Sequence, residues 1–247
     1  MFLDQNIFLI HNVVFAGKVI MTGRDNELWQ QSWRDRNTAF HQKLVNPHLV
    51  NYWPNLGLTA ADRIFVPLCG KSLDMLWLAR QGHTVIGVEL SPLAVRAFFR
   101  ENRLQASRRP VGKFTLWENG RIGILCGDFF QLTAADLGDI SAVFDRASLT
   151  ALPDEIRGAY LEHLQAILPA ACKMLLLTTE EPEDGETQGQ AFAVADEIAG
   201  LYASAFEIQL SHVESFFEPD PDPAIKTPVR VEEKVYLLTP KTRLPAV

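Results

Sequence analysis

The stretch IFVPLCGKSLDMLWLARQGHTVIGVE, residues Ile64–Glu89, decides the fold. It begins as a short apolar segment, turns at Gly70, and continues with apolar side chains that recur at helical spacing. A second apolar segment, Thr84–Glu89, then ends in a carboxylate. This order predicts a buried strand, a tight turn, a helix and a second strand that runs parallel to the first.

Gly70 and Glu89 carry the first functional prediction. A glycine between a strand and a helix lets the backbone approach a bound nucleotide closely, and an acid after the next strand can accept hydrogen bonds from ribose hydroxyls. The two residues are 19 positions apart, close to the spacing of about 20 that is typical of such sites. The spacing leaves one alternative open: Gly70 as a plain turn and Glu89 as a helix-capping acid.

Phosphate binding is disfavoured by the missing glycines. A dinucleotide fingerprint needs three glycines where this turn has one, and a phosphate-binding loop needs a glycine at position 65, which is Phe65. A nucleoside ligand without phosphate, such as S-adenosylmethionine, suits the pattern better. The pattern therefore also argues against a nicotinamide oxidoreductase and an NTPase.

Strand and helix patterns continue to alternate along the chain. Further strands are expected at 121–126, 140–144 and 174–178, with helices between them and an irregular segment at 105–120. The last two strands, at 207–213 and 234–238, have no helix pattern between them and are expected to form an antiparallel hairpin at a sheet edge. The prediction is a doubly wound α/β fold in a single domain, 21–247, with helices on both faces.

Composition and short sequence patterns argue against several kinds of binding partner. The 247 residues include 23 basic and 30 acidic side chains, a net charge of −7, which argues against a nucleic-acid partner. No apolar run has a transmembrane length, so no membrane partner is expected. Three well-separated cysteines indicate a reduced, cytoplasmic protein. Neither Cys-x-x-Cys nor His-Glu-x-x-His occurs, so no metal is expected, and without sustained heptads we expect a monomer.

The first twenty residues are apolar but are interrupted by His11 and Asn12, which is unlike a signal peptide. We expect residues 1–20 to be an N-terminal extension of the domain. Met21 is an alternative start, because polar, helix-like sequence follows it directly.

The chain resembles the thiopurine S-methyltransferase family, most closely its bacterial branch. The segments that carry the resemblance are LWQQSW (28–33), TAFHQ (38–42), Asn46-Pro47, VPLCGKSLD (66–74), QGHTVIGVEL (81–90), CGDFF (126–130), FDRA (144–147) and KVYLL (234–238). The resemblance implies a Rossmann-like class I methyltransferase fold. That fold has a seven-stranded, mostly parallel sheet whose last strand is antiparallel.

The resemblance also implies a set of cofactor contacts for S-adenosyl-L-methionine, which leaves as S-adenosyl-L-homocysteine. By position, these contacts fall on Trp33, Leu68, Glu89 and Arg146, with Trp29 nearby and with Asp128 and Phe129 flanking the adenine, and they join the Gly70 turn that the spacing already indicates. Phe40 matches a position that lines the acceptor pocket. Trp29 and Trp33, four residues apart on one helix face, suit a sulfonium cation through cation–π attraction. A plain core stripe is the alternative.

The implied reaction is transfer of a methyl group to the sulfur of thiopurines or related aromatic thiols. Arg146 is expected to favour the thiolate form through its charge, or else to pair with an acid such as Asp145. Asp145 and His41 are the candidate proton acceptors, and His41 has an alternative role as a polar tether. Cys69 has no partner base in the pattern and is expected to be a small packing residue in the turn.

Two loops depart from the family pattern. Residues 189–192 stand where the family has a Gly-Pro-Pro-Phe-like turn, and the 180–186 and 217–229 segments are unusually acidic or proline-rich. They keep a second function open: methylation of selenium or tellurium species or of small thiols in detoxification. A third possible function is non-catalytic nucleotide binding. We further expect residues 24–53 to close over the cofactor as a lid.

Overall fold

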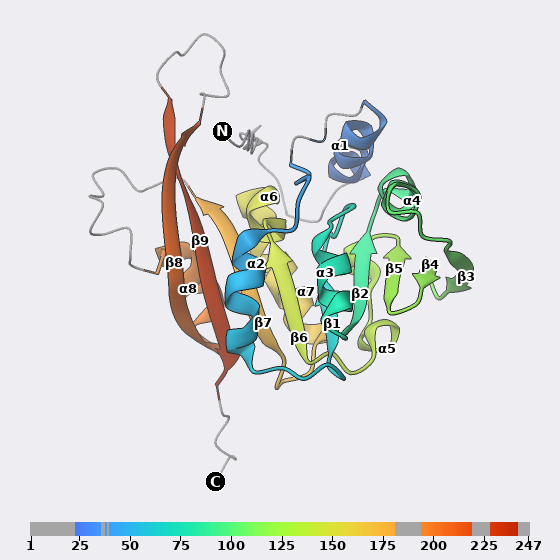
Figure 1. Cartoon of the computed structure of the whole chain (residues 1–247). Coiled ribbons are helices and arrows are strands. Elements are labelled where there is room, and N and C mark those ends of the chain that lie inside the picture. The colour runs from blue at the N-terminus through green and yellow to red at the C-terminus, as the bar shows by residue number, and fades with distance from the viewer. Residues whose placement is uncertain (1–22, 36–37, 39, 181–193, 219–227, 242–247) are drawn as a thin grey trace.

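One mixed sheet with helices on both faces makes up the protein (Figure 1). The computed structural model describes residues 23–35, 38, 40–180, 194–218 and 228–241. Its strands are β1 (Arg63–Val66), β2 (Thr84–Glu89), β3 (Ser107–Val111), β4 (Phe114–Asn119), β5 (Ile122–Cys126), β6 (Ala142–Arg146), β7 (Lys173–Glu180), β8 (Phe206–Glu218) and β9 (Val229–Pro240). Its helices are α1 (Gly23–Arg34), α2 (Pro47–Tyr52), α3 (Asp74–Arg80), α4 (Pro92–Glu101), α5 (Ala134–Leu137), α6 (Ser148–Ala151), α7 (Asp154–Ile167) and α8 (Asp196–Tyr202), with 3-10 turns η1 (Trp53–Leu56) and η2 (Phe129–Gln131).

The strand order is β3-β4-β5-β2-β1-β6-β7-β9-β8. The five strands from β5 to β7 are parallel, and β9 runs antiparallel to both of its neighbours, β7 and β8. The part of the order from β5 to β8 is therefore the expected seven-stranded sheet, in which the last strand of the chain is the antiparallel one. The expected hairpin at the sheet edge is confirmed as β8 and β9.

The strand count corrects the sequence prediction, because the described residues form nine strands and not seven. The segment expected to be irregular, 105–120, is the β3–β4 hairpin, which pairs antiparallel with β5. A two-residue connection at Gly112, whose φ is 54°, turns the chain. The hairpin was hard to predict because β3 is almost entirely exposed and polar, so it lacks the apolar alternation of a half-buried strand.

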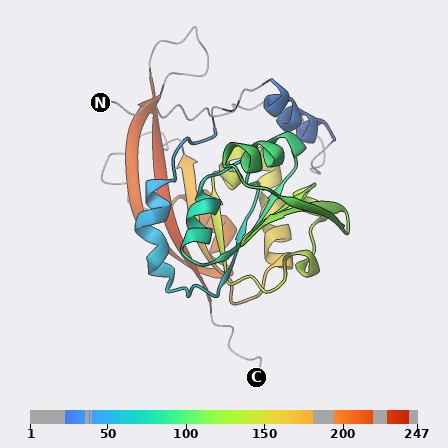
Figure 2. The same cartoon turned by 45° about the vertical axis from the view of Figure 1, so that its right-hand side comes forward.

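Helices cover both faces of the sheet (Figure 2), and a hydrophobic core lies on each face. Within β1, Phe65 faces the core formed with α5 to α8, whereas Ile64 and Val66 face the core formed with α2, η1, α3 and α4. A strand covered on both faces reads as a continuous apolar run, which is why β1 is RIFV and not an alternating pattern. The sheet centre is thus fixed from both sides.

The carboxyl ends of the parallel strands form the edge on which α1 lies (Figure 1). Two turns at this edge hold non-glycine residues with positive φ, Leu68 at 43° after β1 and Ala147 at 59° after β6. Such conformations are uncommon and concentrate at binding sites, where the surrounding structure stabilises them. These two turns therefore indicate a binding site at this edge of the sheet.

Several predictions fall on residues that the structure does not describe: the extension 1–20 with Met21, the turn 189–192, and most of the 180–186 and 217–229 loops. The helix expected at 192–202 is α8, beginning at Asp196. Among the described residues, no helix is long and apolar enough to cross a bilayer.

Candidate active site at the carboxyl edge of the sheet

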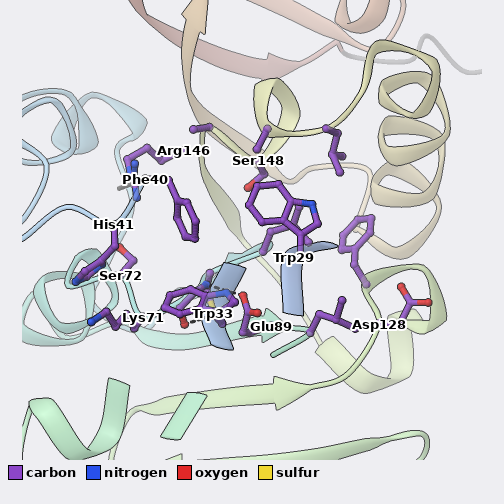
Figure 3. Close-up of a pocket in the computed structure, with 18 residues that line it drawn as sticks. Trp29, Trp33, Phe40, His41, Lys71, Ser72, Glu89, Asp128, Arg146 and Ser148 are labelled. Atoms are coloured by element: carbon purple, nitrogen blue, oxygen red, sulfur yellow. Dashed lines mark hydrogen bonds between the residues drawn. The ribbon is translucent and has the colours of Figure 1, made fainter. Parts of the chain in front are cut away.

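A pocket opens at this edge between α1 and the turns that follow β1, β2, β5 and β6 (Figure 3). The space between its side chains is about 910 Å³, part of it open to solvent. Residues far apart in the sequence meet here, and all the predicted site residues except Asp145 line it: Trp29, Trp33, Phe40, His41, Leu68, Gly70, Glu89, Asp128, Phe129 and Arg146. The structure also adds Lys71, Ser72 and Ser148 to the lining.

Glu89 and Gly70 are joined directly. One carboxylate oxygen of Glu89 accepts the backbone N–H of Gly70 at 2.9 Å, and the other accepts the N–H of Ser91 at 2.7 Å. Gly70 has φ of 53°, and a Cβ there would lie 3.3 Å from the Trp33 ring. Glycine is needed at this position both for the turn and for the close approach of the tryptophan.

The hydrogen-bonding capacity of the Glu89 carboxylate shows whether a ribose could bind at this position. The residue is buried, and loss of solvation raises the pKa of Glu89 to about 7, against the opposing effect of its backbone donors. A carboxylate can accept about four hydrogen bonds, so acceptor capacity remains on a side chain that faces the pocket. Two hydroxyl donors from a ribose would fill that capacity, so this residue fits the predicted nucleoside cofactor.

Three aromatic rings form one wall of the pocket. Trp29 and Trp33 both project from α1 and both contact Phe40 edge to face, with ring centroids 5.6 and 5.4 Å apart. Edge-to-face packing is a favourable arrangement for aromatic pairs. The alternative of a plain core stripe does not fit, because all three residues line the pocket and none is fully buried.

Asp128 and Phe129 follow β5, and both line the pocket. The Asp128 carboxylate accepts the N–H of Phe130 and so caps the short turn η2. Phe129 is buried and stacks on Tyr160 of α7 with ring centroids 4.9 Å apart. These contacts fix the two side chains at one end of the pocket.

Arg146 contacts Asp74, with Nε 3.5 Å from the carboxylate. Asp74 is buried and also accepts the N–H of Asn46 and the hydroxyl of Ser72, both at 2.8 Å. The carboxylate is thus held by two donors from separate segments before it meets the guanidinium. Sequence reasoning missed Asp74, although an acid two residues after the GKS run, at the start of a helix, was a usable signal.

Asp145, the neighbour of Arg146, lies behind the pocket wall. It is fully buried, and its oxygens accept the Tyr160 hydroxyl at 2.6 Å and the N–H of Ser148 at 3.1 Å. The Ser148 hydroxyl in turn donates to the carbonyl of Pro67. Asp145 therefore positions the turn after β6 and is not in the pocket lining.

His41 lines the pocket beside two cations. Burial, together with the charges of Lys71 and Arg146, lowers the pKa of His41 to about 4. The ring is thus neutral at physiological pH and can accept a hydrogen bond. Lys71 forms an ion pair with Glu101 of α4 at 2.8 Å, which anchors its ammonium group near the pocket rim.

Cys69 is a packing residue, as expected. Its thiol is buried against Gly87, where an added Cβ would lie 2.6 Å from the sulfur. Burial raises the pKa of Cys69, which keeps the thiol protonated and unreactive.

Comparisons with known proteins agree with this geometry. Residues 24–241 match the model of the family described as thiopurine S-methyltransferase. A thiopurine S-methyltransferase of Stutzerimonas stutzeri is 57% identical over 90% of this chain and 93% of its own length. One of Nitrosospira multiformis is 44% identical, covering 87% of this chain and 98% of the relative.

Solved structures share the fold at low sequence identity. The 1,6-didemethyltoxoflavin-N1-methyltransferase of Burkholderia thailandensis, crystallised with 1,6-didemethyltoxoflavin and S-adenosylhomocysteine, has a TM-score of 0.57 at 15% identity, over 92% of this chain and 93% of that one. An S-adenosylmethionine-dependent methyltransferase of Anabaena variabilis has a TM-score of 0.56 at 14% identity, over 94% and 100%. With the family model matched over residues 24–241, the chain belongs to the thiopurine S-methyltransferase family and is an S-adenosylmethionine-dependent methyltransferase.

Proposed function

We propose that this enzyme methylates the sulfur of thiopurines or of related aromatic and heterocyclic thiols. The observation that carries the proposal is the composition of the pocket. An aromatic wall of Trp29, Trp33 and Phe40 lines the same cavity as the cationic Arg146 and Lys71 (Figure 3). Flat aromatic rings suit a planar heterocycle, and positive charge suits the anion that such a thiol forms.

Several of the other lining residues would hold the cofactor. The Glu89 carboxylate would accept the ribose hydroxyls, Asp128 and Phe129 would flank the adenine, and the backbone around Leu68 and Gly70 would approach the amino-acid tail. When bound, S-adenosylmethionine supplies a methyl group on a positively charged sulfur. Trp29 and Trp33 would stabilise such a cation by cation–π attraction.

The protein's part in the reaction is to orient the acceptor and keep it in the anionic form. The Arg146 guanidinium, fixed by Asp74, lowers the pKa of a nearby thiol by its charge. Since thiopurine thiols ionise readily, no strong base is required. We assign His41 the role of accepting a hydrogen bond from the acceptor thiol before that thiol ionises, and Asp145 a positioning role behind the pocket.

The experiment is to measure S-adenosylhomocysteine release and product mass with 6-mercaptopurine, and with the matched 6-hydroxypurine that lacks the sulfur. Release only with the thiol, and a product heavier by one methyl group on sulfur, is the expected result. The selenium, tellurium and small-thiol acceptors are tested in the same assay. Turnover with these alone would move the assignment to that second function, and cofactor binding without turnover on any acceptor would overturn both.

A further inference from the structure

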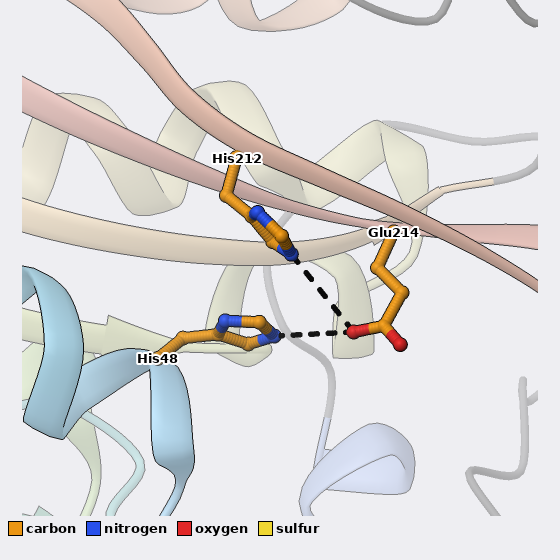
Figure 4. A group of neighbouring side chains, drawn as sticks. All are labelled: His48, His212 and Glu214. Atoms are coloured by element: carbon orange, nitrogen blue, oxygen red, sulfur yellow. Dashed lines mark ion pairs between the residues drawn. The ribbon is translucent and has the colours of Figure 1, made fainter.

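A second polar cluster lies away from the pocket, where α2 packs against the β8–β9 hairpin. His48 of α2 and His212 and Glu214 of β8 point toward one another (Figure 4). The Glu214 carboxylate is 3.8 Å from Nε2 of His48 and 3.9 Å from Nε2 of His212. One nitrogen or oxygen atom from each of the three residues lies within 4.8 Å of the others.

These separations are close to those of a metal site. Zinc bonds to histidine nitrogen and carboxylate oxygen are about 2.0–2.2 Å long, so tetrahedral ligands stand roughly 3.3–3.6 Å apart. The gaps from Glu214 to His48 and His212, 3.8 and 3.9 Å, exceed this by a few tenths of an ångström, and all three ligand atoms lie within 4.8 Å of one another. Side-chain rotations would bring them to bonding distance. Glu214 is exposed, so an ion can enter from solvent, whereas His48 is buried.

Glu233 of β9 lies next to His48 but outside the three-residue cluster. Its carboxylate lies 3.6 Å from Nε2 of His48 and is largely buried. The two imidazole rings lie 4.7 Å apart, so two protonated rings would repel each other, and a single shared cation avoids that repulsion.

We propose that His48, His212 and Glu214 bind a divalent transition metal ion, with Zn²⁺ as the best match. Two imidazoles exclude the hard cations Mg²⁺ and Ca²⁺, which take oxygen ligands, and no thiolate is present in the cluster to select softer ions. Three protein ligands leave the fourth position of a tetrahedral zinc ion to water.

A bound metal ion would restrain the segment of chain that leads into the pocket. A metal held by α2 and β8 fixes the start of α2, and Asn46 caps that helix. The N–H of Asn46 donates to Asp74, and Asp74 contacts Arg146 in the pocket. Metal binding would therefore restrain the chain just after Phe40 and His41.

One feature of the site limits its affinity. Among the described residues, Nδ1 of His48 has no hydrogen-bond partner, so no neighbouring acceptor orients the ring. Outer hydrogen bonds of this kind contribute about 10- to 100-fold to metal affinity. We expect binding that is correspondingly weaker than that of a fully supported zinc site, and removable by a chelator.

The test uses the full chain without an affinity tag, stripped with a chelator and titrated with Zn²⁺ in competition with a chromophoric chelator. Thermal melting with Zn²⁺ and with Mg²⁺ is measured in parallel. The expected result is one Zn²⁺ per chain, a higher melting temperature with Zn²⁺ only, and visible absorption typical of four-coordinate Co²⁺ after cobalt substitution.

The variants are His212→Gln and Glu214→Gln, with Glu207→Gln as the matched control on the exposed face of the same strand. Each ligand variant should weaken zinc binding more than about tenfold, since loss of an outer partner alone costs that much. The control should bind as the parent does. No stoichiometric binding, or binding unchanged in both ligand variants, overturns the proposal and leaves the cluster as proton-dependent ion pairs.

Discussion

The carboxylate of Glu89 accepts the backbone N–H of Gly70 at 2.9 Å, which joins the end of β2 to the turn after β1. This contact sets the floor of the pocket, because the same turn carries Leu68 and lies against Trp33. Cofactor binding and turn geometry are therefore linked through one carboxylate. The first three predictions follow from this link.

Glu89→Gln should weaken S-adenosylhomocysteine binding by about 10- to 100-fold. The amide has one acceptor oxygen in place of two, and a hydrogen bond to a charged group contributes about 1.5–3 kcal/mol. Isothermal titration calorimetry measures the change. Glu118→Gln, an exposed acid on β4 that pairs with Arg109, is the control and should bind normally. Equal affinities for all three proteins would exclude Glu89 from the cofactor site.

Cofactor affinity should depend on pH through Glu89. Burial raises the pKa of Glu89 to about 7, and ribose hydroxyls bind the charged form. Affinity should therefore be constant above the pKa and fall as the pH drops below it, approaching about tenfold per pH unit. Since the pKa of His41 is lowered to about 4, that ring does not titrate in the same window. Titrations from pH 6 to 9 should give a flat profile for Glu89→Gln, and a flat profile for the parent would contradict the assignment.

Gly70→Ala should reduce both stability and cofactor affinity. Its φ of 53° costs an alanine about 1–2 kcal/mol, and the added Cβ, 3.3 Å from Trp33, displaces a pocket ring. Gly57→Ala provides the matched control, because Gly57 has φ of 61° with nothing within 4 Å of the added atom. Thermal melting should drop in both variants, while calorimetry should show weaker binding only in Gly70→Ala. Loss of affinity in Gly57→Ala would show that backbone strain alone explains the effect.

Arg146→Lys should lower turnover even at saturating cofactor. Lysine keeps the charge but loses the planar fork that contacts Asp74, so the cation no longer has a fixed position. A reduction in kcat of about tenfold or more is expected for the loss of a charge-assisted hydrogen bond. Arg109→Lys, on the exposed β3–β4 hairpin, should leave kcat unchanged. If the variant only raised KM for the cofactor and left kcat unchanged, Arg146 would have no role toward the acceptor.

The α1 segment should close over bound cofactor, a narrower version of the lid expected at 24–53. Leu49 and Trp53 are buried in the core, so α2 belongs to the body of the protein, whereas Leu28 of α1 is 62% exposed. Tryptic cleavage after Arg34 and Lys43, both exposed, should slow when S-adenosylhomocysteine is present. Cleavage after the exposed Arg103, outside this segment, serves as the reference. If S-adenosylhomocysteine changed the cleavage rate at none of the three sites, the lid would be excluded.

Local patterns were enough to predict the centre of the fold. The apolar runs of β1 and β2 and the turn at Gly70 are decided by neighbouring residues, because burial on both faces demands continuous apolar strands. The β3–β4 hairpin was missed for the converse reason. Its outer strand is polar and exposed, and only pairing with β4 makes it a strand.

Sequence by itself determined that Gly70 and Glu89 belong together, since a fixed spacing across one strand–helix–strand unit brings them to one edge. Only the tertiary structure showed that Arg146 is held by Asp74, 72 positions earlier in the chain, and that Asp145 lies behind the pocket. It alone brought His48 beside Glu214. Side chains on strands and helices that pack across the sheet have no fixed sequence spacing, so only the packing of those elements decides which of them meet.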